Sequence, residues 1–193
     1  MSYKITYKTA LVVVDAQVDF FEGGTLAVPS SNVVLPVIQH YLDLFHQLNR
    51  SIFLTRDWHP TNHCSFKSQK GPWPTHCVQH TNGAQFHPKL KIPTHAVIIS
   101  KADRQFTDAY SGFQDTSLNT ELKNRGILEI AVCGLATDYC VKHTVLDARR
   151  LGYKVFLLVD GIKGVDVKTG ESEKAIQEMV GAGAKIATCG ELQ

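Results

Sequence analysis

The sequence predicts an α/β fold in which a six-stranded, mainly parallel sheet lies between two layers of helices, a Rossmann-like three-layer sandwich. Two observations support this prediction. Short apolar runs, several of them nearly continuous, alternate with segments whose apolar residues recur every three or four positions. Such alternation favours a parallel sheet with right-handed crossovers. We therefore expect helices on both faces and the doubly wound strand order 3-2-1-4-5-6.

Six runs of strand length are expected to form the sheet. They are ALVVVD (10–15), SIFLTRD (51–57), AVIISK (96–101), EIAVCG (129–134), KVFLLVD (154–160) and AKIATC (184–189). Several of them lack the alternation of polar and apolar residues that is typical of a strand with one solvent-exposed face. This pattern is typical of parallel strands buried on both faces.

Four segments between these runs have the spacing of amphipathic helices. They span residues 32–50, 117–125, 137–151 and 171–181. Gly126 and Gly152 follow two of these segments directly. Glycine commonly ends a helix in the left-handed conformation, so both residues are predicted helix stops.

The chain from Asp57 to about Pro93 has no helical pattern and is rich in Pro, Gly, Thr and Asn. It carries more than half of the nine histidines, namely His59, His63, His76, His80 and His87. Long irregular loops inside compact domains are usually functional. We therefore expect this loop to contribute to a site.

Composition excludes several classes of protein. A length of 193 residues, with 44% hydrophobic and 20% charged residues, predicts one globular domain over residues 1–193. The net charge of +2 comes from scattered residues, so we expect neither nucleic acid nor a membrane surface as partner. No signal peptide is apparent, and the odd number of five cysteines argues against a disulfide framework. We expect a cytoplasmic protein, with a homo-oligomer left open.

Reactive side chains are expected at one edge of the sheet. Asp15, Asp57 and Lys101 end the first three predicted strands, and Cys140 follows the fourth. In an open parallel sheet, ligands bind outside the carboxyl ends of the strands, where the strand order reverses. The first and fourth strands are neighbours in the predicted order, so Asp15 and Cys140 should flank this point.

Cys140 has two interpretations. Thr137 is a suitable N-cap, which would place Cys140 in the first helical turn, where free N–H groups and the helix dipole favour a thiolate. The same N–H groups would suit an oxyanion. Alternatively, Cys140 is a small buried residue that packs on the sheet, and its position alone slightly favours this second interpretation.

Asp15 and Lys101 also have two interpretations each. A carboxylate after a buried run needs partners or takes up a proton. Asp15 is therefore either a loop-capping residue or a general base for a nearby thiol. Lys101 is either an ordinary surface lysine or a counter-ion that keeps Asp15 ionised.

The motif DWH, residues 57–59, indicates a metal site. Residues i and i+2 of an extended chain point the same way, so Asp57 and His59 can bind one ion. His63 and His76 would complete a mixed oxygen–nitrogen set suited to Zn²⁺, Mn²⁺ or Fe²⁺. Taken singly, such histidines are more often surface residues. The motif followed by a histidine-rich loop makes metal binding the favoured interpretation.

Three aromatic residues follow the first three predicted strands, namely Phe20, Trp73 and Tyr110. Core packing is the default role for such side chains. Their segments nevertheless lie where a planar ligand would bind.

Several of these segments together resemble the nicotinamidase (pyrazinamidase) branch of the isochorismatase-like cysteine hydrolases, over essentially the whole chain. The segments are VVVDAQVDFFEGGTLAV, TRDWHPTNHCSF, WPTHCVQHTNGAQFHP, the region from Lys101 to DAYSGF, and VCGLATDYCV. The last segment, VCGLATDYCV, together with the DxH pair, is fairly specific for this branch. Family members commonly carry glycine after the lysine, where this chain has Ala102.

The resemblance implies hydrolysis of nicotinamide to nicotinic acid and ammonia, with pyrazinamide as a further substrate. It implies a catalytic triad of Asp15, Lys101 and Cys140. It also implies a cis peptide bond between Leu135 and Ala136, with the N–H groups of Ala136 and Cys140 forming the oxyanion hole.

The resemblance further implies a metal ion and a ring pocket. One divalent ion, Zn²⁺ in the first place and Mn²⁺ or Fe²⁺ otherwise, would be bound by Asp57, His59 and His76, with His63 as a less secure fourth ligand. The substrate ring would be bound by Phe20, Trp73, Leu135 and Tyr110.

Two alternative functions stay open. One is a related amidase of the same superfamily that acts on a different substrate. The combination of DWH and Trp73 disfavours it, because a metal and an aromatic wall suit a planar nitrogen heterocycle. The other is a non-catalytic metal- or ligand-binding module. No GxGxxG motif follows the first strand, which weakens a dinucleotide version of this alternative.

Overall fold

A single parallel sheet organises the computed structural model, which describes residues 3–192. Its strand order is β3-β2-β1-β4-β5-β6, and every neighbouring pair is parallel. The strands are β1 (Thr9–Val14), β2 (Ile52–Asp57), β3 (Val97–Lys101), β4 (Glu129–Leu135), β5 (Lys154–Lys163) and β6 (Lys185–Ala187). The predicted fold class and strand order are confirmed.

Strand β1 shows why these runs form the centre of the sheet. All of its residues are buried, and successive side chains of a strand point to opposite faces. Leu11 and Val13 pack into the hydrophobic cluster on one face. Val12 and Val14 pack into the cluster on the other face. A strand covered on both sides therefore needs an unbroken apolar sequence.

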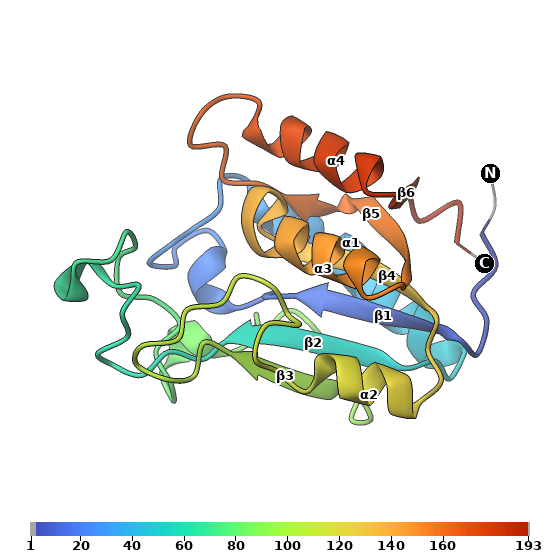
Figure 1. Cartoon of the computed structure of the whole chain (residues 1–193), viewed down its shortest axis with the longest axis horizontal. Helices are drawn as coiled ribbons and strands as arrows, with labels where there is room; N and C mark the ends of the chain where they lie inside the picture. The colour runs from blue at the N-terminus through green and yellow to red at the C-terminus, as the bar shows by residue number, and fades with distance from the viewer. Residues whose placement is uncertain (1–2, 193) are drawn as a thin grey trace.

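The helices cover both faces of the sheet (Figure 1). Helix α1 (Leu35–Gln47) packs its buried side chains into one cluster. Helices α2 (Leu118–Asn124), α3 (Lys142–Arg150) and α4 (Glu171–Gly181) contribute to the other. All four predicted helices are present. The first is shorter than predicted, because residues Ser31–Val34 form a 3₁₀ turn and the helix ends at Gln47.

The turn between β4 and α3 differs from the prediction. Residues Thr137–Val141 form a π-helical turn, in which the N–H of Val141 donates to the carbonyl oxygen of Ala136 at 3.1 Å. Ala136 is thus the N-cap residue, and no side chain caps this turn. The assignment of Thr137 as N-cap was wrong. The wide first turn moves the start of the helix back by one residue, and Thr137 is buried within it.

The long loop between β2 and β3 lies at the carboxyl edge of the sheet, the side to which the strand arrows point in Figure 1. Its described regular structure consists of two short 3₁₀ turns, Lys67–Gln69 and Asn82–Ala84. Backbone hydrogen bonds hold the start of the loop against its middle. The N–H of His59 donates to the carbonyl of Cys77 at 3.0 Å, and that of Gln79 to His59 at 2.8 Å. The loop is thereby folded back over the strand ends.

Within residues 3–192, none of the helices combines the length and the apolar character needed to cross a membrane.

Candidate active site

The strand ends bring the predicted reactive residues together. Asp57 and Lys101 are register partners at the ends of β2 and β3. Asp15 follows β1 directly, and its N–H donates to the carbonyl of Thr55 on β2 at 3.2 Å. Neighbouring parallel strands that end at the same level therefore carry these three side chains to one point.

Lys101 lies at the centre of this group. Its Nζ atom lies 3.0 Å from Oδ2 of Asp15 and 3.5 Å from Sγ of Cys140, and it also pairs with Oδ1 of Asp57. A further hydrogen bond runs to the carbonyl of Ala109 at 3.2 Å. Burial alone lowers the pKa of Lys101, but the two carboxylates outweigh it and raise this pKa well above its usual value. Lys101 is a buried, permanently charged ammonium rather than a surface lysine.

Asp15 is fully buried and has one carboxylate oxygen that accepts no hydrogen bond. Its Oδ1 accepts a hydrogen bond of 2.6 Å from the hydroxyl of Thr55. Its Oδ2 faces Lys101 at an ion-pair distance without the alignment of a hydrogen bond. Burial raises the pKa of Asp15, and the ammonium of Lys101 opposes this rise only in part. A free oxygen on a carboxylate of raised pKa is suited to accepting a proton.

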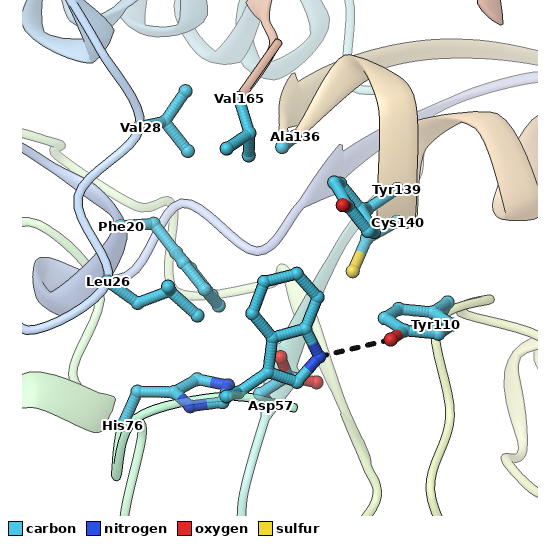
Figure 2. Close-up of a pocket in the computed structure, with 11 residues that line it drawn as sticks. Phe20, Leu26, Val28, Asp57, His76, Tyr110, Ala136, Tyr139, Cys140 and Val165 are labelled. Carbon is cyan, nitrogen blue, oxygen red and sulfur yellow. Dashed lines mark hydrogen bonds between the residues drawn. The ribbon is translucent and has the colours of Figure 1, made fainter. Parts of the chain in front are cut away.

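Cys140 is 7% exposed and its sulfur points into a pocket (Figure 2). Burial raises the pKa of its thiol well above the usual value, although Lys101 acts in the opposite direction. The expectation that the helix start would favour a resting thiolate is therefore not met. Desolvation of the thiolate is the largest cause of this rise, and Asp15 and Asp57 add to it. The thiol keeps its proton until a base removes it, and its sulfur lies within 4.8 Å of a carboxylate oxygen of Asp15.

A second cluster joins Asp57, His59 and His76, whose ligand atoms lie within 4.8 Å of one another. The Nδ1 atoms of both histidines face backbone carbonyls, Ala102 at 3.1 Å and Pro74 at 2.7 Å. A carbonyl only accepts, so each Nδ1 carries the hydrogen and each Nε2 presents its lone pair. Such hydrogen bonds are typical of metal-binding histidines.

The separation of Asp57 and His59 fits two ligands of one divalent ion. The Nε2 atom of His59 lies 3.7 Å from Oδ2 of Asp57. Bonds from zinc to nitrogen or oxygen are about 2.0–2.2 Å long, so two ligands of one ion lie no more than about 4.3 Å apart. Burial by itself raises the pKa of Asp57, but Lys101 and His59 lower it overall, so this carboxylate is ionised. One carboxylate and two imidazoles form a donor set that Zn²⁺ accepts.

Another group consists of Asp15, Asp57 and Cys140, each of which offers one possible ligand atom. These three atoms also lie within 4.8 Å of one another. The ammonium of Lys101 contacts all three side chains and so supplies the positive charge between them. In the group of Asp57, His59 and His76, by contrast, the Nε2 atoms of both histidines are left to face a metal.

His63 lies outside the ligand cluster. Its ring stacks on that of His59 with centroids 4.1 Å apart. Its Nε2 faces the carbonyl of Thr107 at 3.1 Å and must donate to it, while Nδ1 lies 2.7 Å from the hydroxyl of Ser65. Both ring nitrogens are thus engaged, and the structure does not bring His63 to the metal position that the sequence suggested for it.

The pocket lies between the thiol and the histidine cluster, and the space between its walls, including the part open to solvent, measures about 420 Å³. Phe20, Trp73 and Tyr110 all line it, and the indole N–H of Trp73 donates to the hydroxyl of Tyr110 at 3.0 Å (Figure 2). Leu135, by contrast, is fully buried in the hydrophobic core and is not among the lining residues. The side chain that follows it, Ala136, takes this place in the wall.

The peptide bond between Leu135 and Ala136 is cis, as the resemblance implied. Ala136 and Cys140 both line the pocket, so the backbone between them borders the space beside the thiol. Ala102, the residue at the usual glycine position, has a φ of 50°, a left-handed conformation that favours glycine. The loop after Lys101 therefore has the shape of a glycine loop although the residue is alanine.

Sequence reasoning missed two buried residues that hold the site together. The side-chain amide of Gln17 makes two hydrogen bonds to the backbone of Asp57. Its Nε2 donates to the carbonyl of Asp57 at 2.7 Å, and its Oε1 accepts from the N–H of Asp57 at 2.8 Å. Asp19 accepts a hydrogen bond of 2.7 Å from the N–H of Cys77, the residue after His76. Both lie just after β1, in the segment VDAQVDF, and the only available signal was their position beside Asp15.

The fold and these side chains define an α/β protein of the class that carries a cysteine, an acid and a lysine beside a cluster of metal ligands at the carboxyl edge of its sheet. The chain belongs to the isochorismatase domain family, whose model matches residues 9–191. The resemblance to the nicotinamidase branch is confirmed by a relative from Escherichia coli (strain K12), a nicotinamidase. It is 42% identical, over 93% of this chain and 94% of its own.

Two solved structures show the same likeness in three dimensions. Pyrazinamidase of Pyrococcus horikoshii in complex with zinc superposes with a TM-score of 0.90 and 45% identity, covering 94% of this chain and 99% of its own. PnC1 from L. infantum in complex with nicotinate gives a TM-score of 0.91 at 35% identity, covering 100% of this chain and 99% of its own.

Proposed function

We propose that this protein is a nicotinamidase, a hydrolase that converts nicotinamide to nicotinic acid and ammonia. One observation carries the proposal. A protonated thiol with a carboxylate and an ammonium beside it shares a pocket with a cluster of metal ligands and an aromatic wall. The relatives at 42%, 37% and 38% identity are nicotinamidases or a nicotinamidase/pyrazinamidase, which supports the same activity.

The acylation step uses Cys140 as nucleophile and Asp15 as base. Asp15 takes the thiol proton as the sulfur adds to the carboxamide carbon, because a buried thiol of raised pKa is unreactive until it is deprotonated. Lys101 keeps its charge and balances the negative charge that passes between the sulfur and Asp15. The N–H groups of Ala136 and Cys140 stabilise the oxyanion. Ammonia leaves with the proton from Asp15, and a thioester remains.

The deacylation step reuses the same base. Asp15 takes a proton from water as the water oxygen adds to the thioester carbon. Collapse of this second tetrahedral intermediate breaks the carbon–sulfur bond, and the sulfur takes the proton back from Asp15. Nicotinic acid is released and the resting thiol is restored.

Asp57, His59 and His76 would hold one divalent ion, which we propose to be Zn²⁺, with Mn²⁺ and Fe²⁺ as alternatives. A bound ion would supply a Lewis-acid contact for the pyridine nitrogen and so orient the ring. Phe20, Trp73 and Tyr110 then hold the ring between them, which places the carboxamide beside Cys140 (Figure 2). Pyrazinamide has the same arrangement of ring nitrogen and carboxamide, and we propose it as a second substrate.

We propose the cytoplasm as the working compartment and NAD salvage as the process. All five cysteines are free thiols, which is usual in a reducing compartment. Nicotinic acid is a precursor of the pyridine nucleotides, so its release from nicotinamide would return the ring to that pool.

The decisive experiment measures ammonia release from nicotinamide by the purified protein, before and after chelation and after addition of Zn²⁺, Mn²⁺ or Fe²⁺. We expect release that is lost with the metal and restored by it. Mass spectrometry of protein quenched during turnover should show a nicotinoyl adduct on Cys140. Absence of ammonia release with a full equivalent of metal bound would refute the proposal.

The matched control for the adduct is Cys133, a fully buried cysteine that lies within β4. An adduct on Cys140 but not on Cys133 supports nucleophilic catalysis. A non-catalytic binding module would give no adduct at either position.

A further inference from the structure

We propose that Val165 limits the size of the ring that the pocket accepts, and that Asp138 is the positioning residue that holds Val165 in place. The inference rests on the proposed function and adds to it the feature that selects among pyridine carboxamides. Neither residue was singled out by its sequence pattern. The structure joins them across 27 positions of the chain, from the turn before α3 to the loop before α4.

Val165 lies at the end of the pocket away from the candidate metal ligands. It lines the pocket with Val28 and Ala136, and in Figure 2 these three lie at the far end from His76 and Asp57. The side chain of Val165 is half-buried and packs against the hydrophobic cluster on the α1 face. The side chains at this end are apolar, so they contribute to the fit of the ring, whereas the backbone N–H of Ala136 serves the proposed oxyanion hole.

The carboxylate of Asp138 accepts two backbone hydrogen bonds from the segment that carries Val165. Its Oδ1 accepts a hydrogen bond of 3.0 Å from the N–H of Val165, and its Oδ2 one of 2.8 Å from the N–H of Asp166. The carboxylate is 7% exposed, and both of its oxygens are used on this one loop. Hydrogen bonds to an ionised carboxylate are stronger than neutral ones. Asp138 stands two residues before Cys140, so it fixes the far wall relative to the nucleophile turn.

Gly164 makes this close approach feasible. A Cβ atom at this position would collide with the hydroxyl of Ser172 and would lie 3.1 Å from Oδ1 of Asp138. A larger residue before Val165 would crowd Ser172 and the carboxylate of Asp138, so glycine favours this close approach of the loop backbone. The glycine and the aspartate are two independent features that place the same valine.

The ring geometry identifies the position that Val165 would restrict. In nicotinamide, the ring nitrogen and the carbon that bears the carboxamide both flank C2. A ring held by its nitrogen near Asp57 and His76, with its carboxamide beside Cys140, directs C4, the atom opposite the nitrogen, and the adjacent C5 toward the far end of the pocket. A substituent at C5 would thus meet Val165, and substrates that carry one should be poor.

The experiment compares nicotinamide with 5-methylnicotinamide on the metal-loaded wild type and three variants. Val165→Ala should improve the kcat/KM ratio of the methylated substrate to nicotinamide by about tenfold, the effect of one methylene in an apolar pocket. Asp138→Ala should shift this ratio in the same direction. It should also raise KM for nicotinamide severalfold and leave kcat nearly unchanged, because the far wall contacts ground state and transition state alike.

Asp160→Ala is the matched control. Asp160 also holds backbone with its carboxylate, accepting from the N–H of Cys189 at 2.8 Å, but it does not line the pocket. This variant should leave the substrate ratio unchanged. The iodoacetamide alkylation rate of Cys140 should also stay unchanged in Asp138→Ala. If Asp138→Ala changed the alkylation rate of Cys140 but left the substrate ratio unchanged, Asp138 would support the turn that carries Cys140. Its role toward Val165 would then be overturned.

Failure of the inference differs from failure of the proposed function. A wild type that releases no ammonia would defeat the function itself. An active wild type whose substrate ratio does not respond to Val165→Ala would defeat the inference alone. Val165→Ala removes no hydrogen bond, so we expect this variant to fold. It therefore tests the inference even if Asp138→Ala does not fold.

Discussion

The ammonium of Lys101 lies 3.0 Å from a carboxylate oxygen of Asp15, and both side chains are completely buried. Burying two charges is expensive, and a buried ion pair often adds little net stability. Here Lys101 also touches Asp57 and the sulfur of Cys140, so one cation joins the acid, the thiol and the candidate metal ligand. This shared cation links the two halves of the site, and each of the following predictions tests one of its contacts or supports.

Loss of the sulfur should abolish turnover without loss of the fold. Cys140→Ala should lower kcat by at least about 10⁴-fold, because the covalent intermediate forms on the sulfur that this variant lacks. Cys140→Ser should be nearly as inactive, since a hydroxyl is much harder to deprotonate. The checks are ammonia release together with nicotinamide binding by calorimetry, which Cys140→Ala should retain. Substantial amidase activity in the alanine variant would remove Cys140 from the mechanism.

Removal of the shared cation should slow alkylation of the thiol. Lys101 lowers the pKa of Cys140 against the effect of burial, so Lys101→Gln should raise this pKa further. Each unit of increase lowers the thiolate fraction at neutral pH about tenfold, and the iodoacetamide rate should fall accordingly. Lys142→Gln, which removes a surface partner of Glu178, is the control and should alkylate like the wild type. Equal rates in both variants would exclude this electrostatic role.

The pH dependence of kcat/KM should show the raised pKa of Asp15 on its acidic side. Activity needs the carboxylate form, so it should fall as the pH drops through the pKa of Asp15. Burial places this pKa above the usual aspartate value. The hydroxyl of Thr55 stabilises the carboxylate and lowers its pKa. Thr55→Val should therefore shift the acidic limb upward, by about one pH unit for a hydrogen bond worth about 1–1.5 kcal/mol.

Thr9→Val provides the comparison for this shift. Thr9 is another fully buried threonine, at the opposite end of β1, where its hydroxyl donates to Glu129. The pH profile of this variant should match that of the wild type. An acidic limb that moves equally in both variants, or in neither, would argue against Asp15 as the base.

Metal binding should distinguish two neighbouring histidines. His76→Gln removes a ligand whose Nε2 is free, and it should lose the bound metal. His63→Gln removes a ring whose nitrogens both make other contacts, and this variant should keep close to one metal ion per protein chain. Elemental analysis after dialysis measures both. A metal-free His63 variant would show that this ring moves to become a ligand, contrary to the geometry described here.

Ala102→Gly should stabilise the protein slightly. A non-glycine residue in the left-handed conformation costs about 1–2 kcal/mol, while the extra freedom of glycine in the unfolded chain costs about 0.4–1 kcal/mol. The net gain should be between zero and about 1.5 kcal/mol in the free energy of unfolding. Denaturant unfolding measures it. Ala109→Gly, at a buried position of ordinary φ in the same loop, should instead be destabilising.

Much of the site was predictable because parallel strands that end together deliver their last residues to one edge. Asp57 and Lys101 end adjacent strands in register, and Asp15 follows the strand beside them. Hydrophobic periodicity alone locates these ends. The D-x-H pair could be assigned to one ion for the same reason, since alternate residues of an extended chain point the same way.

Other features depend on contacts between distant segments. His63 and His76 are equally plausible ligands by sequence, and only the carbonyl of Thr107 beside one of them decides between them. The thiol pKa of Cys140 was judged from its place near a helix start, whereas burial governs it in the folded chain. The π-helical turn at Thr137–Val141 has no signal in residue propensities.

The sequence by itself determined the order of the strands, the edge at which the reactive side chains meet and the family to which the chain belongs, because periodicity, strand ends and local motifs are written in neighbouring residues. Tertiary structure alone decided the protonation of the thiol, the histidines that can bind metal, and the carboxylate that holds the wall at Val165. These properties arise from desolvation and from hydrogen bonds between segments far apart in the chain, and the position of a residue along the sequence does not encode which partner it will meet.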